Sequence, residues 1–228
     1  PGLKAIEKIA NKINGSTGEI WIIAPALERS GVGHCISLTQ PSLISQLGPQ
    51  KYAIDGNPAD CIIAALHHIL KGSPPDLILS GVNRGNNSAE NALYSGTLGA
   101  ALEGALQGIP SMALSQYLGP KNFNIEDPFE ASHSHGSELI QEILSQKLSS
   151  KDNYDIFYNI NFPPCPAKDV KGVRVTPQGH RKNNHFTIES TKTPSMRELL
   201  FVKGGDQQAS ASPGCDVYAN LNGYISVT

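Results

Sequence analysis

The sequence DLILSGVNRGNNSAENALYSGTLGAALEGALQGIP, from Asp76 to Pro110, carries most of the information about the fold. It opens with a short apolar run typical of a buried strand, then breaks into a loop of glycines, asparagines and one arginine. A helix rich in small residues follows, beginning near Ser95-Gly96-Thr97. Because this order places many polar groups at one point where a strand leaves the core, we predict a binding site there.

Strands and helices alternate along the first two-thirds of the chain. Apolar residues at helical spacing predict helices over residues 3–13, 59–70, 96–108 and 132–148. Short continuous apolar runs predict strands over 19–25, 52–54, 76–80 and 110–115. The alternation predicts an α/β fold whose parallel sheet is covered by helices on both faces. Since the first helix begins at once, we expect a further strand to precede it.

The last third changes character. Short β-runs such as DIFYNINFP and ELLFVKGG flank the polar, asparagine-rich segment HRKNNHFTIESTKTPS, residues 180–195. This composition predicts a mixed or antiparallel extension with a protruding β-hairpin. No segment has the length or composition of a linker, so we expect residues 1–228 to form a single domain.

The bulk composition excludes several functional classes. The formal net charge is −2 and basic residues do not cluster, so we expect no nucleic-acid polymer as partner. No stretch approaches the roughly 20 apolar residues that span a bilayer, so we expect no membrane partner. The four cysteines are scattered without a CxxC pair, which predicts buried, reduced thiols in a cytoplasmic protein.

Two loops that follow predicted strands carry candidate metal ligands. Ser30 lies in the loop 26–34, and Asn83 lies in the loop 81–87. Loops at the carboxyl ends of parallel strands share one edge of the sheet, so these two residues could be neighbours. Their oxygens suit Mg²⁺, Mn²⁺ or Ca²⁺, but only beside one or two carboxylates. The alternatives are an ordinary turn or cap serine at residue 30 and a left-handed turn asparagine at residue 83.

The helix start at Ser95, Gly96 and Thr97 predicts an anion site, because free amides, hydroxyls and the helix dipole all favour negative charge there. A plain N-cap explains one hydroxyl but not all three residues. Arg84 could clamp a phosphate, although a solvated arginine is the alternative. His34 is a weaker candidate for donating to a substrate oxygen. The glycines match neither GxGxxG nor the P-loop pattern, which argues against a dinucleotide enzyme.

The segments APALERSGVGHCISLTQP, AIDGNPADC, PDLILSGVNRGNN, YSGTLGAALEGALQGIPS and GYISVT together closely resemble the survival protein SurE family of metal-dependent nucleotide phosphatases. The resemblance runs from Pro1 to Thr228. It implies a Rossmann-like domain with a β-hairpin extension used in dimer or tetramer contacts. It also implies hydrolysis of nucleoside 5′- and 3′-monophosphates, with some action on short polyphosphate.

The resemblance also implies a divalent metal, Mg²⁺ or Mn²⁺, held by two aspartates with Ser30 and Asn83. The family's two aspartates belong to an NDDG loop after its first strand, upstream of the PGL with which this sequence begins, and the family pattern continues beyond YISVT. We therefore expect a chain that lacks the first strand and the Asp-Asp loop and is also clipped at its C-terminus. If the pair is truly absent, the alternative is a nucleotide- or phosphate-binding module without hydrolytic activity.

Overall fold

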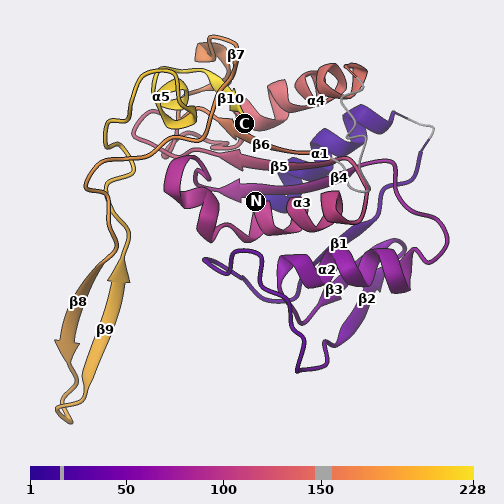
Figure 1. Cartoon of the computed structure of the whole chain (residues 1–228), viewed down its shortest axis with the longest axis horizontal. Coiled ribbons are helices and arrows are strands. Elements are labelled where there is room, and N and C mark those ends of the chain that lie inside the picture. The colour runs from indigo at the N-terminus through magenta and orange to yellow at the C-terminus, as the bar shows by residue number, and fades with distance from the viewer. Residues whose placement is uncertain (16–17, 147–155) are drawn as a thin grey trace.

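A computed structural model describes residues 1–15, 18–146 and 156–228 of the protein (Figure 1). Its α-helices are α1 (Gly2–Asn14), α2 (Pro58–Ala64), α3 (Gly96–Leu106), α4 (Glu130–Ser145) and α5 (Asp216–Leu221). Shorter helical turns of other types are η1 (Ala65–Ile69), η2 (Ala89–Tyr94) and η3 (Ala167–Asp169). Its strands are β1 (Ile22–Pro25), β2 (Ile44–Gly48), β3 (Lys51–Ile54), β4 (Ile78–Arg84), β5 (Ser111–Gln116), β6 (Phe157–Phe162), β7 (Val173–Val175), β8 (Thr187–Lys192), β9 (Glu198–Lys203) and β10 (Ile225–Val227).

The described strands form two body sheets and a separate hairpin. The larger sheet has the order β4-β5-β6-β10-β7, in which β4, β5 and β6 are parallel and β10 runs antiparallel to β6. A smaller sheet has the order β1-β3-β2, with β1 parallel and β2 antiparallel to β3. The predicted α/β fold with a parallel-sheet core is confirmed. The sequence did not predict β2, nor that β1 and β4 would belong to different sheets.

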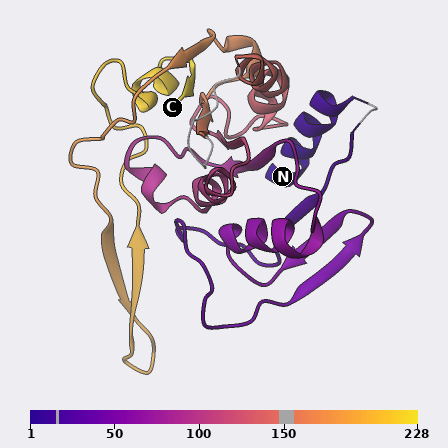
Figure 2. The same cartoon turned by 45° about the vertical axis from the view of Figure 1, so that its right-hand side comes forward.

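Helices cover both faces of the larger sheet, as predicted. Helix α1 contacts β4 and α4, whereas α3 contacts β4, β5 and α2 (Figures 1 and 2). Each predicted helix of the body corresponds to one observed helix, although α2 continues as η1 and the predicted positions 147–148 lie outside the described residues. The sheet therefore presents the carboxyl ends of its parallel strands between two helical layers.

The main hydrophobic core lies between the larger sheet and the layer formed by α1 and α4. Strands β5 and β6 contribute Leu114, Ile160 and Phe162, and the helices contribute Ile9 and Ile140. All five side chains are fully buried. Burying one such side chain stabilises the fold by about 1.5–3 kcal/mol, so this layer anchors the parallel strands.

The β8–β9 pair is the predicted β-hairpin extension. Its strands pair antiparallel from Thr187 opposite Lys203 to Lys192 opposite Glu198. Both views show it projecting away from the body (Figures 1 and 2). All of its residues are exposed, including the apolar Ile188 and Phe201.

The predictions about the cysteines and about membrane-spanning segments can be compared with the structure. The four cysteines are free thiols, and Cys61, Cys165 and Cys215 are buried. Cys35 is exposed, so the prediction of buried thiols is wrong at that position, because it lies in the open loop after β1 rather than in an element of the core. Within the described ranges, every helix is too short or too polar to cross a bilayer.

Candidate active site

A β-bulge near the end of β4 sets the direction of Asn83. The pairing of β4 with β5 shifts register between Ser80 and Asn83. Gly81 has a φ of +133°, and a Cβ there would lie 2.3 Å from the Leu114 carbonyl oxygen, so no other residue fits without movement of the backbone. Bulges of this kind turn the side chains that follow them. The bulge thus fixes how the last residues of β4 leave the sheet.

Asn83 lies in the strand rather than in the turn that follows it. It pairs with Ser115 of β5, and the positive φ of the turn belongs to Gly85 instead. The alternative of a left-handed turn asparagine at residue 83 is therefore wrong. The Asn83 amide nitrogen donates to the Gly85 carbonyl at 3.0 Å. That bond uses only the nitrogen, so the side-chain oxygen, which is the atom a hard cation binds, is left for another partner.

The loop that carries Ser30 lies against the start of α3. The Gly33 amide donates to the Tyr94 carbonyl at 3.0 Å. A Cβ on Gly99 would lie 2.5 Å from the Gly33 carbonyl oxygen, which shows how closely the two segments approach. Ser30 itself is exposed, three positions before Gly33. The structure therefore brings the loop of one predicted metal ligand to the predicted anion site.

The start of α3 combines capping with close packing. Ser95 is the N-cap, and its buried hydroxyl oxygen accepts from the Leu98 amide at 3.1 Å. A Cβ on Gly96 would lie 2.9 Å from the Pro58 ring, so packing against α2 requires glycine at this position. The amides of Gly96 and Thr97 belong to the first turn, where a helix supplies no partner from its own carbonyls. These amides and the Thr97 hydroxyl remain suited to an anion.

His34 is held by a carboxylate that the sequence analysis did not single out. The His34 Nε2 atom lies 2.7 Å from the Glu103 Oε2 atom. Glu103 is buried on α3 and accepts a second hydrogen bond from Gln107 at 2.8 Å. This contact orients the imidazole, as the carboxylate of a catalytic pair does. Glu103 was missed because a glutamate within a helix has no distinctive sequence pattern.

The loop after β4 is fixed by polar side chains from neighbouring strands. The backbone amide of Asn87 donates to the Asn161 side-chain oxygen at 2.7 Å, and the side-chain amide of Asn87 donates to the Ser115 hydroxyl at 2.7 Å. Asn159 of β6 donates to the Asn87 carbonyl at 2.9 Å. The buried backbone of this loop is therefore satisfied by side chains, and the loop is held firmly beside Asn83.

The same loop is clamped by Arg181, at the base of the hairpin extension. The fully buried guanidinium donates to Glu90 at 2.9 Å and to the Asn86 side chain at 2.8 Å. Glu90 also accepts from Asn184 at 2.7 Å. Burial raises the pKa of Glu90, but the hydrogen bonds from Asn184 and Arg181 outweigh it, and the net pKa is lowered. Glu90 is therefore held as a carboxylate paired with the arginine.

The described residues supply only part of a metal site. Ser30 and Asn83 offer neutral oxygens, and Arg84 is exposed at the end of β4. No group of three or more histidine, cysteine or acidic side chains within the described residues could hold a metal ion. Two neutral oxygen donors fit a hard divalent cation only when carboxylates complete the set. The donor chemistry thus fits Mg²⁺ or Mn²⁺ as one part of a larger site.

The fold is that of an α/β protein. Its candidate site lies at the carboxyl ends of the parallel strands, where the polar loops meet the start of α3. A family model described as Survival protein SurE matches residues 1–185. The chain belongs to this family, as its motifs predicted.

Curated relatives and a solved structure agree with this assignment. The chain is 58% identical over 228 residues to a 5′-nucleotidase SurE of Ruegeria sp., covering 100% of this chain and 88% of that protein. It is 54% identical to a 5′-nucleotidase SurE of Roseobacter denitrificans, covering 100% and 87%. The crystal structure of SurE protein from Aquifex aeolicus matches with a TM-score of 0.78 and 33% identity, covering 100% and 87%. The predicted enzyme class, a phosphoric monoester hydrolase, is that of the named relatives.

Proposed function

We propose that this chain hydrolyses nucleoside 5′- and 3′-monophosphates to nucleoside and phosphate, and also acts on short polyphosphate. The relatives' name supports the 5′ activity. The observation that carries the proposal is the hydrogen bond from Gly33 to Tyr94, which brings the Ser30 loop to the start of α3. A phosphate bound by that helix start would lie beside the oxygen donors at the carboxyl ends of β1 and β4.

The proposed cofactor is Mg²⁺ or Mn²⁺, held by Ser30, Asn83 and the two aspartates of an upstream NDDG loop. When bound, such a cation polarises a phosphoryl oxygen and lowers the pKa of a bound water. The Asn83 side chain is suited to this role because its hydrogen bond to Gly85 fixes the amide group. Ser30, in the loop that leaves β1, would contribute a second neutral oxygen.

The chain's own residues would bind and orient the substrate. The amides of Gly96 and Thr97 would donate to phosphate oxygens and stabilise the charge that develops in the transition state. Ser95 keeps the helix start in place through its cap, and Arg84 would reach the phosphate from the end of β4. His34, oriented by Glu103, would hold the proton for the leaving nucleoside oxygen.

The proposal includes a homodimer or homotetramer in the cytoplasm, with no nucleic-acid polymer or membrane as partner. Apolar side chains lie on both faces of the hairpin and are exposed: Ile188, Leu199, Leu200, Phe201 and Val202. Contiguous exposed apolar surface of this kind marks a protein interface. Phe201→Asp is expected to lower the molar mass measured by light scattering if the hairpin joins protomers.

The activity is tested in a chain extended upstream by the Asp-Asp loop. Asn83→Ala should reduce metal-dependent phosphate release from a nucleoside monophosphate by at least about 100-fold, because one ligand to the cation is lost. Asn11→Ala is the matched control, since Asn11 is exposed on α1 and its side chain donates to the Glu7 carbonyl of the same helix. Normal turnover by Asn83→Ala would refute the assignment of this residue.

A binding module without hydrolysis is the second candidate. It is favoured by the donor set of the described residues, which contains no group of three metal-binding side chains. Calorimetry of Mn²⁺ with the upstream-extended chain of the activity test separates the two functions, because the 228-residue chain alone offers only the neutral donors. An absence of binding, together with phosphate binding at the start of α3, supports the module, whereas micromolar Mn²⁺ binding excludes it.

A further inference from the structure

A series of hydrogen bonds runs from the surface of the protein to His34. At its inner end, the His34 Nε2 atom lies 2.7 Å from the Glu103 Oε2 atom. The other carboxylate oxygen, Oε1, accepts from the Gln107 side-chain amide at 2.8 Å. At the outer end, the His67 Nε2 atom lies 3.1 Å from the Gln107 side-chain oxygen. This series, here called the His67–His34 relay, joins η1 to the end of α3 and to the loop after β1.

The carboxylate of Glu103 fixes the direction of every bond in the relay. An ionised carboxylate only accepts hydrogen bonds, so Gln107 donates through its side-chain nitrogen and His34 donates its Nε2 proton. The Gln107 oxygen is then the atom that faces His67, and His67 donates to it from its own Nε2 atom. Each bond of the relay therefore has one possible donor, and each oxygen of Glu103 receives one proton.

The inner part of the relay is shielded from water and the outer part is not. The Glu103 side chain is 6% exposed and the His34 side chain is 28% exposed, whereas Gln107 and His67 are both exposed. A buried carboxylate oxygen that loses its donor costs free energy, so the Glu103 side chain would move to regain a partner. Such a movement would weaken the bond to His34. The exposed residues of the relay thus bear on the geometry of the buried ones.

A widened helical turn carries His67. The Leu70 amide donates to the Ala65 carbonyl, five positions back in the chain, at 2.7 Å. This π-type turn, η1, continues α2, which contacts α3. The extra residue in such a turn rotates the side chains that it carries relative to a regular α-helix, and turns of this kind recur at functional sites. From this turn His67 reaches Gln107, which is 40 positions away in sequence.

We propose that Gln107 and His67 are positioning residues for His34 and act through Glu103. The relay holds the carboxylate in place, and the carboxylate keeps a proton on the His34 Nε2 atom. The Nδ1 atom is then the ring nitrogen through which His34 exchanges a proton during the reaction. In each turnover Nδ1 would give one proton to the leaving nucleoside oxygen and regain one from the attacking water. This catalytic part rests on the proposed function, whereas the relay itself is a property of the described residues.

The relay is tested first without any activity, by NMR of the isotope-labelled 228-residue chain. A ring proton held against a buried carboxylate is protected from exchange with water, so the His34 Nε2 proton should give a separate signal that is lost in His34→Gln. Gln107→Met keeps the length of the side chain but removes the amide, and should speed exchange of this proton by at least about threefold. His67→Ala should speed it by about twofold. His67→Gln, whose amide can still donate to Gln107, should restore the slow exchange.

His68→Ala is the matched control for His67→Ala. His68 is the exposed neighbour of His67 on the same turn and lies outside the relay. Its substitution should leave exchange of the His34 ring proton unchanged. Because Gln107, His67 and His68 are all exposed, circular dichroism should show the same folded content in every variant. Equal exchange in Gln107→Met and the unchanged chain would overturn the proposal, as would equal responses to His67→Ala and His68→Ala.

The effect on catalysis is measured in the chain extended upstream by the Asp-Asp loop. Gln107→Met should lower kcat about three- to tenfold and leave KM within about twofold, since His34 acts on the leaving group rather than in binding. In the His34→Gln background, Gln107→Met should have no further effect on kcat, because the residue that it positions is gone. Additive losses would mean that Gln107 acts independently of His34 and would overturn the proposal.

The two measurements separate this inference from the proposed function. Slow exchange that depends on Gln107 and His67, together with non-additive losses of kcat, supports both. The same exchange in an extended chain that releases no phosphate supports the positioning of His34 and counts against the phosphatase. Phosphate release in a chain whose His34 ring proton does not respond to Gln107→Met supports the phosphatase and removes the relay.

Discussion

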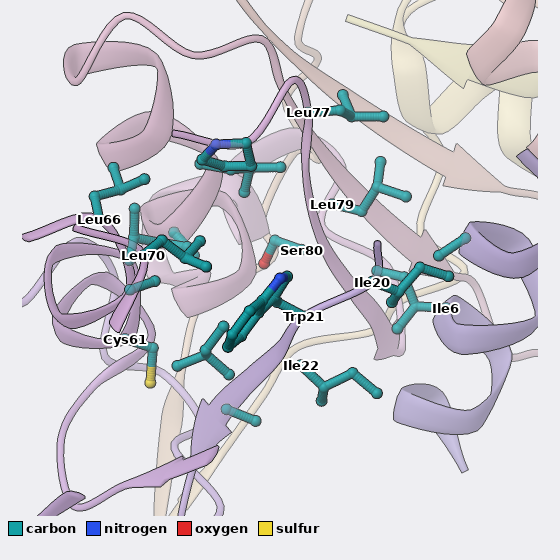
Figure 3. A pocket seen from close by; sticks show the side chains of 18 of the residues that line it. Ile6, Ile20, Trp21, Ile22, Cys61, Leu66, Leu70, Leu77, Leu79 and Ser80 are labelled. Atoms are coloured by element: carbon teal, nitrogen blue, oxygen red, sulfur yellow. The ribbon is translucent and has the colours of Figure 1, made fainter. Parts of the chain in front are cut away.

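The two edges of β4 differ more than any other neighbouring surfaces in the protein. On one edge, β4 forms a parallel ladder with β5, every residue of which is buried. On the other edge lies an apolar cavity of about 1100 Å³, lined in part by Ile22 and Leu79 (Figure 3), and β1 belongs to a separate sheet. The comparison shows that the half of the fold built on β4, β5 and β6, here called the complete half, is joined by continuous ladders, whereas no described strand pairs β4 with β1.

The carboxyl end of β4 gains its order from the complete half. The loop from Asn86 to Glu90 is bonded to β5, to β6 and to Arg181 at the base of the hairpin. None of these bonds reaches across the cavity to β1. The position of Asn83 should therefore depend on the complete half rather than on β1.

The largest expected effect comes from Arg181 in the complete half. Arg181→Ala leaves Glu90 as a partly buried carboxylate without its guanidinium, and the free energy of unfolding should fall by about 3–5 kcal/mol. Urea denaturation measures this fall in the free energy of unfolding. Arg174→Ala is the matched control, since Arg174 is exposed over the Tyr224 ring and should cost less than about 1 kcal/mol. Equal losses of unfolding free energy in the two variants would show that the buried Arg181 contributes no more to stability than the exposed Arg174.

Leucines on the two edges of β4 should differ in the same way. Leu114→Ala removes a fully buried side chain of β5 and should cost about 2–5 kcal/mol. Leu79→Ala, beside the cavity, should cost less than about 1 kcal/mol in the 228-residue chain, because Leu79 is only partly buried and lacks contacts on the cavity side. A loss at Leu79 that matches the loss at Leu114 would mean that the two edges are packed alike.

The cap of α3 predicts a moderate effect. Ser95→Ala removes the acceptor of the Leu98 amide and should lower the free energy of unfolding by about 1 kcal/mol. Ser95→Asp should restore most of this stability, since aspartate also caps helices. If Ser95→Ala leaves thermal stability unchanged, the cap contributes little to this edge of the sheet.

The smallest expected effect concerns pH. The lowered pKa of Glu90 means that its contribution to stability is present above its ordinary value of 4.5 and is lost as pH falls through the lower, folded value. Glu90→Gln should therefore flatten the loss of stability between about pH 5 and pH 3. Asp60 and Asp127 also have lowered pKa values, so part of the slope should remain. Identical slopes with and without Glu90 would exclude a role for this pair.

Local patterns predicted the elements whose residues carry their own signal. Continuous apolar runs gave β4 and β5, and the Ser-Gly-Thr sequence gave the start of α3 at the observed residue. Strand β2 was missed because its residues are only half-buried or exposed and carry no continuous apolar run.

The contacts that hold the site could not be predicted from local sequence patterns. Arg181 and Glu103 belong to segments whose composition is ordinary, and their partners are 91 and 69 positions away in sequence. Only the fold brings them to Glu90 and His34. The predicted role of Gly96 also changes in part, because close packing against Pro58 accounts for this glycine independently of any anion.

Hydrogen exchange of single amides, followed by NMR, tests the difference between the two edges of β4 most directly. In the 228-residue chain the Ile22 and Ile78 amides donate to the Gln50 and Pro110 carbonyls, whereas the alternating Ile23 and Leu79 amides point toward the cavity. The Ile23 and Leu79 amides should therefore exchange at least about tenfold faster than those of Ile22 and Ile78. If all four amides exchange equally slowly, the account is contradicted.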